Sequence, residues 1–309
     1  MKKTVPALML VSLVVLVSLL TSGCGLTKSQ KEGINAFGKA ASTLGAASKD
    51  QFVGGRERVI EMKRQQLAME RKTLPAKKPD GSKADREFYA GVLDLDSGLD
   101  RKKIETRVAA VELLIQYGDL LVAFSENTQE KELTAAAGKF TDSIKGFPDN
   151  PLTTAQIAGL GQLAVVAGKM WVEHEKKEAL KQIIPMVSPL VEQVCTDLEK
   201  DFDLKKRGVT EEIYNRQDRL ASEAIDGLKR EGGSLGDRLL LIDGFALADK
   251  NKAEAETASK KFLKTVATMR AADKKLVSLI NDDKISLDVI SSFAVDAKDL
   301  AKAVKPFAK

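Results

Sequence analysis

Apolar residues recur at alternating spacings of three and four along most of the chain, which is typical of helices that bury one face. No segment has a convincing strand pattern. The helical periodicity covers residues 34–44, 56–71, 104–122, 133–147, 154–184, 191–202, 210–228, 234–282 and 286–307. We therefore expect an all-α fold, a bundle of long antiparallel amphipathic helices with coiled-coil-like hairpins.

Glycine, proline and capping residues suggest where these helices begin and end. Gly54-Gly55 is expected to break the first helical stretch, and Pro185 is expected to stop or kink the helix that begins at Thr154. Ser188-Pro189 would then open the next helix as an N-cap and a first-turn proline. Further capping residues are expected at Asn127 with Glu130, Ser234 with Asp237, and Ser286.

The longest helical stretch, residues 234–282, would span about 73 Å if it is unbroken. Its later apolar stripe keeps coiled-coil spacing, with Asp273 as a polar interruption. A polar segment containing proline and glycine separates the early helices from the later ones. The expected divisions are a signal peptide (1–23), an N-terminal helical segment (24–72), a polar linker (73–97) and a helical bundle domain (98–309).

The first 23 residues have the layout of a secretory signal peptide. Met1-Lys2-Lys3 is a basic head, an apolar run covers residues 5–20, and small residues follow. That run is shorter than the roughly 20 residues that cross a bilayer comfortably. The sequence therefore predicts export and removal of this segment.

Thr21-Ser22-Gly23-Cys24 resembles a bacterial lipobox, although that motif usually has Leu where Thr21 stands. The resemblance implies that Cys24 receives a diacylglycerol and becomes the new N-terminus, and Gly25 after it implies sorting to the outer membrane. The remainder resembles the all-helical envelope lipoproteins of Gram-negative bacteria, without indicating a characterised family. The implied location is the inner leaflet of the outer membrane facing the periplasm, with surface exposure possible. An ordinary signal peptide with a chance cysteine is the alternative.

The amino-acid composition is typical of a folded protein and argues against nucleic-acid binding. The 309 residues are 43% hydrophobic and 30% charged, which allows a buried core and a solvated surface. After residues 1–23 are removed, 47 basic and 44 acidic residues leave a net charge of +3. This is too slight for a nucleic-acid-binding protein, which needs a clustered basic face.

Two catalytic motifs match in letters but not in context. Residues 232–236, GGSLG, fit a nucleophile elbow, but a helix precedes Ser234 and the single histidine, His174, comes earlier in the chain. Residues 159–164, GLGQLA, fit a dinucleotide-binding pattern but follow a turn rather than a strand. We expect a helix break and close helix–helix contact at these two places, and a packing role for His174.

A calcium loop is a weaker possibility before the helix at 104–122. Gly98 and Leu99 occupy positions where an EF-hand needs a ligand and a glycine, and Ser97 with Asp100 also reads as a helix cap. The candidate calcium ligands are Asp94, Asp96, Asp100 and Glu105.

Residues 155–168 are uncharged and rich in small side chains, which fits buried helix packing or, as the alternative, membrane insertion. With Cys24 acylated, Cys195 has no intramolecular disulfide partner. Its place on an apolar stripe predicts burial, and an intermolecular disulfide is the alternative.

These observations predict a non-catalytic, lipid-anchored envelope protein that binds another protein as an adaptor, scaffold or immunity-type inhibitor. No cofactor, resident metal or nucleic-acid partner is expected. The alternatives are a membrane-active or pore-associated helical protein and a carrier of a small apolar ligand inside the bundle.

Overall fold

The computed structural model describes residues 25–70, 87–88, 91, 93–95, 99–126, 130–148, 150–169, 173–230, 232–282 and 284–304. Within these ranges the regular structure is helical and no strand occurs, which confirms the all-α bundle. The helices are α2 (Lys28–Glu70), α4 (Arg101–Ser125), α5 (Glu130–Lys145), α6 (Thr154–Lys169), α7 (Glu173–Phe202), α8 (Val209–Lys229), α9 (Leu235–Leu279) and α10 (Asp288–Val304).

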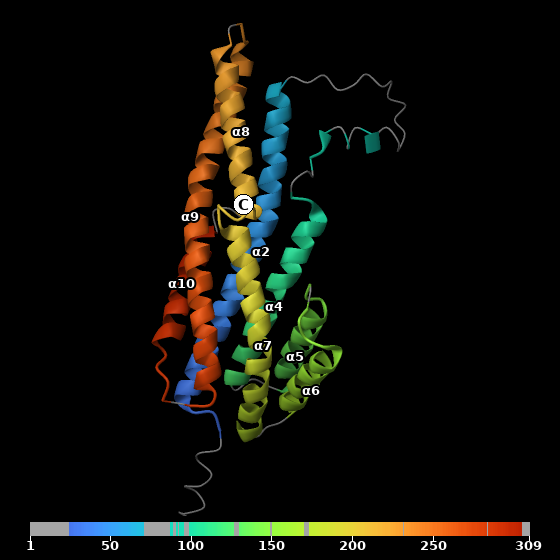
Figure 1. The fold of residues 1–309 in the computed structure, drawn as a ribbon, viewed down its shortest axis with the longest axis vertical. Helices are drawn as coiled ribbons and strands as arrows, with labels where there is room; N and C mark the ends of the chain where they lie inside the picture. The colour runs from blue at the N-terminus through green and yellow to red at the C-terminus, as the bar shows by residue number, and fades with distance from the viewer. Residues whose placement is uncertain are drawn as a thin grey trace, which may run out of the picture.

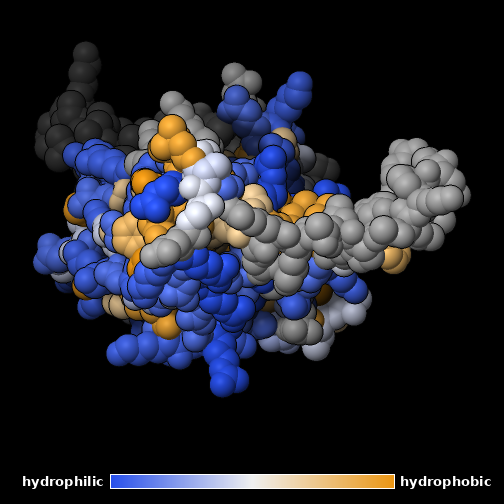
Figure 2. All heavy atoms as spheres, turned by 90° about the horizontal axis from the view of Figure 1, so that it is seen from above, coloured by the Kyte–Doolittle hydropathy of each residue, from blue (hydrophilic) through white to orange (hydrophobic). Residues whose placement is uncertain are grey.

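The long helices lie roughly parallel to one axis of an elongated molecule (Figure 1). α8 and α9 form a hairpin whose turn lies at one end, and the start of α2 lies at the other. α7 and α8 follow one another along α9, while α5 and α6 lie beside α4 and α7. Seen from the hairpin end, the surface is mostly hydrophilic with separate hydrophobic areas (Figure 2). Coiled-coil packing within the hairpins stays a prediction.

α2 runs through the expected break at Gly54-Gly55, so that prediction is wrong. Both glycines are buried. A Cβ on Gly55 would lie 3.0 Å from Ile213 Cδ1 of α8, so the missing side chain lets the two helices approach. Burial of the surrounding apolar residues outweighs the roughly 1 kcal/mol that each glycine costs a helix.

α7 likewise passes through Pro185 and Pro189, so the expected stop and restart there are also wrong. Both prolines are exposed and lie four residues apart, on the solvent side of the helix. The carbonyl groups that they cannot bond therefore face water, while the neighbouring Ile184 and Val187 remain buried. The helix is sustained by its packed face.

The expected single helix over 154–184 is divided in the structure. α6 ends at Lys169 and α7 begins at Glu173. α6 packs mainly on α5, whereas α7 packs mainly on α9. One straight helix could not pack on both α5 and α9 in this way. His174 is exposed near the start of α7, so its predicted packing role is wrong.

One predicted cap is confirmed, and another is displaced by one residue. Ser234 and Asp237 form a reciprocal capping box at the start of α9. Asp288 N–H donates to the Ser286 hydroxyl (3.2 Å), but Leu287 is the N-cap of α10, since its carbonyl accepts from Ser291 N–H (2.8 Å). Asn127, the other expected cap, lies outside the described residues.

α4 is long and apolar enough, by length and composition, to cross a membrane. In the bundle, 61% of its apolar window is buried. Leu113, Leu114, Tyr117, Leu120 and Leu121 are fully buried in it. Its hydrophobicity therefore matches that of a core helix.

α2 and α4 cross in backbone contact at a pair of glycines. A Cβ on Gly38 would lie 2.6 Å from the Gly118 carbonyl oxygen, and one on Gly118 would lie 2.3 Å from the Gly38 oxygen. Beside this crossing, the Ser42 hydroxyl is within hydrogen-bond distance of the Ile115 carbonyl (3.0 Å) and an Asp119 carboxylate oxygen (2.6 Å). Neither backbone can accommodate a methyl group without moving.

We expect Gly118→Ala to lower the free energy of unfolding by about 1–3 kcal/mol, because the added methyl group meets rigid backbone. Gly138→Ala on α5 is the matched control, since a Cβ there has no neighbour within 4 Å. It should raise stability by about 0.5–1 kcal/mol through helix propensity. Urea unfolding followed by circular dichroism measures both. Equal effects of the two substitutions would contradict the close crossing.

Candidate functional site

The structure gives the sequence-predicted motifs structural roles. The Ser234 hydroxyl accepts from Asp237 N–H (3.2 Å) and lies 2.9 Å from an Asp237 carboxylate oxygen, so GGSLG forms a helix cap. In GLGQLA, a Cβ on Gly161 would lie 3.0 Å from Thr141 Cγ2, which confirms close helix–helix contact there. Gly159 has no such neighbour.

The calcium candidates are not brought together among the described residues, which hold no metal-binding group of three acidic, histidine or cysteine side chains. Asp100 is the N-cap of α4 and accepts from Lys103 N–H (2.9 Å), and this hydrogen bond keeps its pKa below the usual value. Glu105 is exposed on α4, and Asp96 lies outside the described residues. Asp100 thus caps a helix, as its alternative interpretation predicted.

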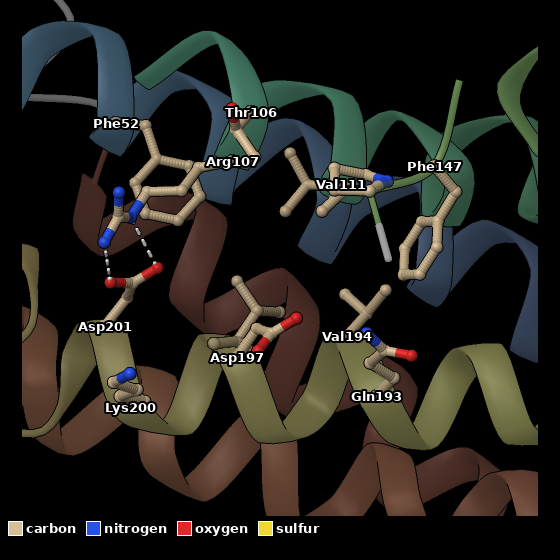
Figure 3. Close-up of a pocket in the computed structure, with 13 residues that line it drawn as sticks. Phe52, Thr106, Arg107, Val111, Phe147, Gln193, Val194, Asp197, Lys200 and Asp201 are labelled. Carbon is tan, nitrogen blue, oxygen red and sulfur yellow. Dashed lines mark hydrogen bonds and ion pairs between the residues drawn. The ribbon is translucent and has the colours of Figure 1, made fainter. Parts of the chain in front are cut away.

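A cleft with a volume of about 250 Å³ lies between α4 and α7 (Figure 3). α4 packs mainly on α2, and α7 packs mainly on α9. The two helices have few contacts with each other, so a gap remains between them. Its apolar lining consists of Phe52, Ala110, Val111, Phe147, Pro148, Val194 and Leu198. Its polar lining consists of Thr106, Arg107, Gln193, Asp197, Lys200 and Asp201.

Stacked aromatic rings fix the floor of the cleft. The Phe52 ring of α2 stacks on Phe202 of α7, with centroids 5.2 Å apart and planes at 15°. Phe202 stacks in turn on Phe262 of α9, with planes at 8°. All three side chains are buried, so the stack is a rigid support beneath the cleft, and only an edge of Phe52 lines it.

An ion pair closes one end of the cleft. Arg107 Nε and Nη2 donate to the two carboxylate oxygens of Asp201, at 2.7 and 2.8 Å (Figure 3). The Asp201 side chain is 8% exposed and the Arg107 side chain 28%, so the pair is largely shielded from water. Such a bidentate pair is geometrically specific and holds α4 against the last turn of α7.

The rim carries both signs of charge as well as uncharged donors and acceptors. Lys200 and Asp197 are exposed on α7, and Thr106 is exposed on α4. Gln193 is half-buried near Phe147 at the far end. An apolar floor under a balanced polar rim can hold an apolar group that is surrounded by hydrogen-bonding groups.

Sequence reasoning missed this cleft because its residues are distant in the chain. Arg107 and Asp201 are 94 positions apart, and Phe52 comes from a third helix. Each residue by itself resembles an ordinary member of an amphipathic helix. No local pattern could have joined them.

The predicted burial of Cys195 is confirmed. Burial raises the pKa of its thiol to about 12, so the group stays protonated and behaves as a small apolar side chain. The alternative, a disulfide to another chain, would require this helix face to open.

Asp273, the predicted polar interruption of α9, is a buried carboxyl group. The Ser188 hydroxyl of α7 donates to its Oδ2 (2.5 Å). Burial raises its pKa to about 6, and the nearby Glu192 adds to this, whereas Ser188 and Lys274 oppose it. Complete burial, with a smaller contribution from the Asp273 carboxylate, raises the pKa of Tyr117 on α4.

No protein-family model, curated protein or solved structure matches this chain. We therefore infer the function from the side chains of the cleft.

We expect Asp273→Asn to stabilise the fold at pH 7 by about 3 kcal/mol, because the folded state favours the uncharged form. With a folded pKa of about 6 against 3.8 unfolded, the protonated carboxyl adds stability below about pH 4, and this is lost as the pH rises to 6. The gap between variant and wild type should therefore shrink from pH 7 to pH 4. Urea unfolding at several pH values measures it, and a gap independent of pH would contradict the assignment.

Proposed function

We propose that this protein is a non-catalytic envelope protein, tethered by an acylated Cys24, that binds another protein through the cleft between α4 and α7. The observation that carries the proposal is the cleft itself, with its rigid aromatic floor and its rim of both charge signs. The role would be that of an adaptor, a scaffold or an immunity-type inhibitor.

The chemistry of the cleft fits a polypeptide segment. One large apolar side chain of the partner would fill the space over Phe52 and Val111. Its backbone N–H and C=O groups would meet acceptors and donors at the rim, such as the Gln193 amide and Lys200. Anchoring by one apolar side chain within a polar rim is typical of protein interfaces.

The position of the cleft along the molecule suits a tethered protein. Phe52 lies 24 residues after the start of α2, about 36 Å along that helix from the end that follows Cys24. A partner bound there would stand clear of the membrane surface. The lipid anchor would raise the local concentration of the cleft for partners in the same membrane or beside it.

Carriage of a small apolar ligand is the second candidate, since the same cleft could hold one. Its volume of about 250 Å³ is below the roughly 300–1,000 Å³ that is usual for ligand pockets. The balanced rim also offers no excess charge for an anionic head group. These features favour a protein side chain over a lipid.

The test places a photo-crosslinking amino acid at Gln193 in the full-length, acylated protein in its own cells. We expect one major crosslinked protein that is absent when the crosslinker is at Lys298, an exposed position on α10. Thr106→Trp, which fills the cleft from an exposed helix position, should abolish this crosslink. Lys200→Glu should reduce it about tenfold by removing a rim contact, whereas Lys298→Glu should not.

Cys24→Ser examines the tether separately, and the crosslink should become weaker if local concentration matters. A crosslink that forms equally from both positions, or that survives Thr106→Trp, would overturn the cleft as the binding site. Mass spectrometry of an organic extract of the purified protein addresses the second candidate. A single lipid that is lost on Thr106→Trp would replace protein binding by ligand carriage.

A further inference from the structure

The first three turns of α9 expose large apolar side chains at the hairpin end of the molecule. The exposed fractions are 75% for Leu235, 52% for Leu239, 49% for Ile242 and 40% for Phe245. The opposite side of the helix is packed, since Leu241 contacts Gly227 of α8 and Gly244 contacts Met69 of α2. Clustered apolar side chains that are exposed on a helix whose opposite side is packed are typical of an interaction site.

The exposed apolar residues follow the spacing of a coiled-coil seam. Leu235, Leu239, Ile242 and Ala246 are separated by steps of four, three and four residues, and all four are exposed. We call these four residues the α9 seam. It covers about 16 Å of helix, after which Asp249 takes the next seam position.

Two opposite charges flank the α9 seam. Arg238 lies about 70° to one side and Asp243 about 70° to the other. Both are exposed, and neither forms an ion pair with another described residue. They are five positions apart, which is the separation of the flanking residues that meet across a parallel two-stranded coiled coil.

We propose that the α9 seam is the contact between two copies of this chain, which pair in parallel and in register. Leu239 of one copy faces Leu239 of the other, and Ile242 faces Ile242. On each side of the seam, Arg238 of one copy meets Asp243 of the other. This interface lies at the opposite end of the molecule from the tether and leaves the cleft between α4 and α7 free.

The charges distinguish this arrangement from an antiparallel one. In an antiparallel pair, residues that flank the seam on one side of a helix meet residues from the same side of the other copy. Arg238 would therefore face Phe245, and Asp243 would face Gly236. No charge would then find a partner. Parallel pairing also puts the starts of both α2 helices at one end, about 65 Å along α2 from the hairpin, so both tethers reach one membrane.

The contact is short, so we expect weak pairing in dilute solution and stronger pairing when acylated copies share a membrane. Disulfide trapping in membranes captures such a contact. The full chain is suitable because acylation blocks Cys24 and Cys195 is buried. The unsubstituted chain reports any background from Cys24.

The experiment introduces Leu235→Cys, Leu239→Cys or Ile242→Cys singly and oxidises the membranes mildly. We expect each variant to give a disulfide-linked dimer, while Lys298→Cys on α10 gives none. Arg238→Glu should lower the yield of the Leu239→Cys dimer roughly tenfold, because two attractive pairs become repulsive. Adding Asp243→Lys should restore the yield.

Three results would overturn the proposal. Trapping at no more than one of the three positions indicates a different register or orientation. Yields that match Lys298→Cys indicate that the α9 seam faces a membrane or another protein. Yields that do not respond to the two charge changes indicate random collision. None of these results bears on crosslinking from Gln193, so the proposed function is tested independently.

Discussion

The contact between the α2 and α4 backbones at Gly38 and Gly118 is the constraint on which the rest of the bundle depends. It brings α2 so close to α4 that these two helices contact each other more extensively than any other pair in the described structure. Other glycines of α2 receive side chains of other helices: Gly33 receives Leu279 and Leu287, and Gly55 receives Ile213. α2 is thus the central helix against which α4, α8, α9 and α10 are placed. This also explains why Gly54-Gly55 does not end it.

Polar groups in the core fix the relative positions of these helices. The Gln30 side-chain amide of α2 donates to the carbonyls of Leu279 and Ile280 (2.9 and 3.1 Å), which satisfies the end of α9. The Ser259 hydroxyl of α9 donates to the Phe202 carbonyl at the end of α7 (2.6 Å). Each hydrogen bond joins distant parts of the chain at one fixed position along the helix axes. A helix that moved along its axis by one turn would therefore leave a buried polar group unpaired.

The sequence predicted the existence of the helices better than their ends. Periodicity reports which face is buried, and that remained correct for α7, whose buried residues follow the predicted stripe. The sequence predicts local breaks at Gly54-Gly55 and Pro185 because the energetic cost of these residues to a helix is local, whereas the packing that outweighs this cost comes from other helices. The cleft lay beyond such reasoning, since Phe52, Arg107 and Asp201 meet only in the folded chain. The α9 seam did leave a signal, the unbroken apolar run at residues 239–242, which no single helix face can bury.

α9 links the two surfaces that carry the proposals. Its second half is packed on α7, where Phe262 supports the aromatic stack beneath the cleft. Its first half reaches the hairpin end, where no described helix covers one of its sides and the seam is exposed. Because one helix without a break spans both regions, a second copy held at the seam would fix the direction in which each cleft faces. Pairing would then present two clefts at a set distance from one membrane, and a partner with two matching segments would bind far more tightly than a partner with one.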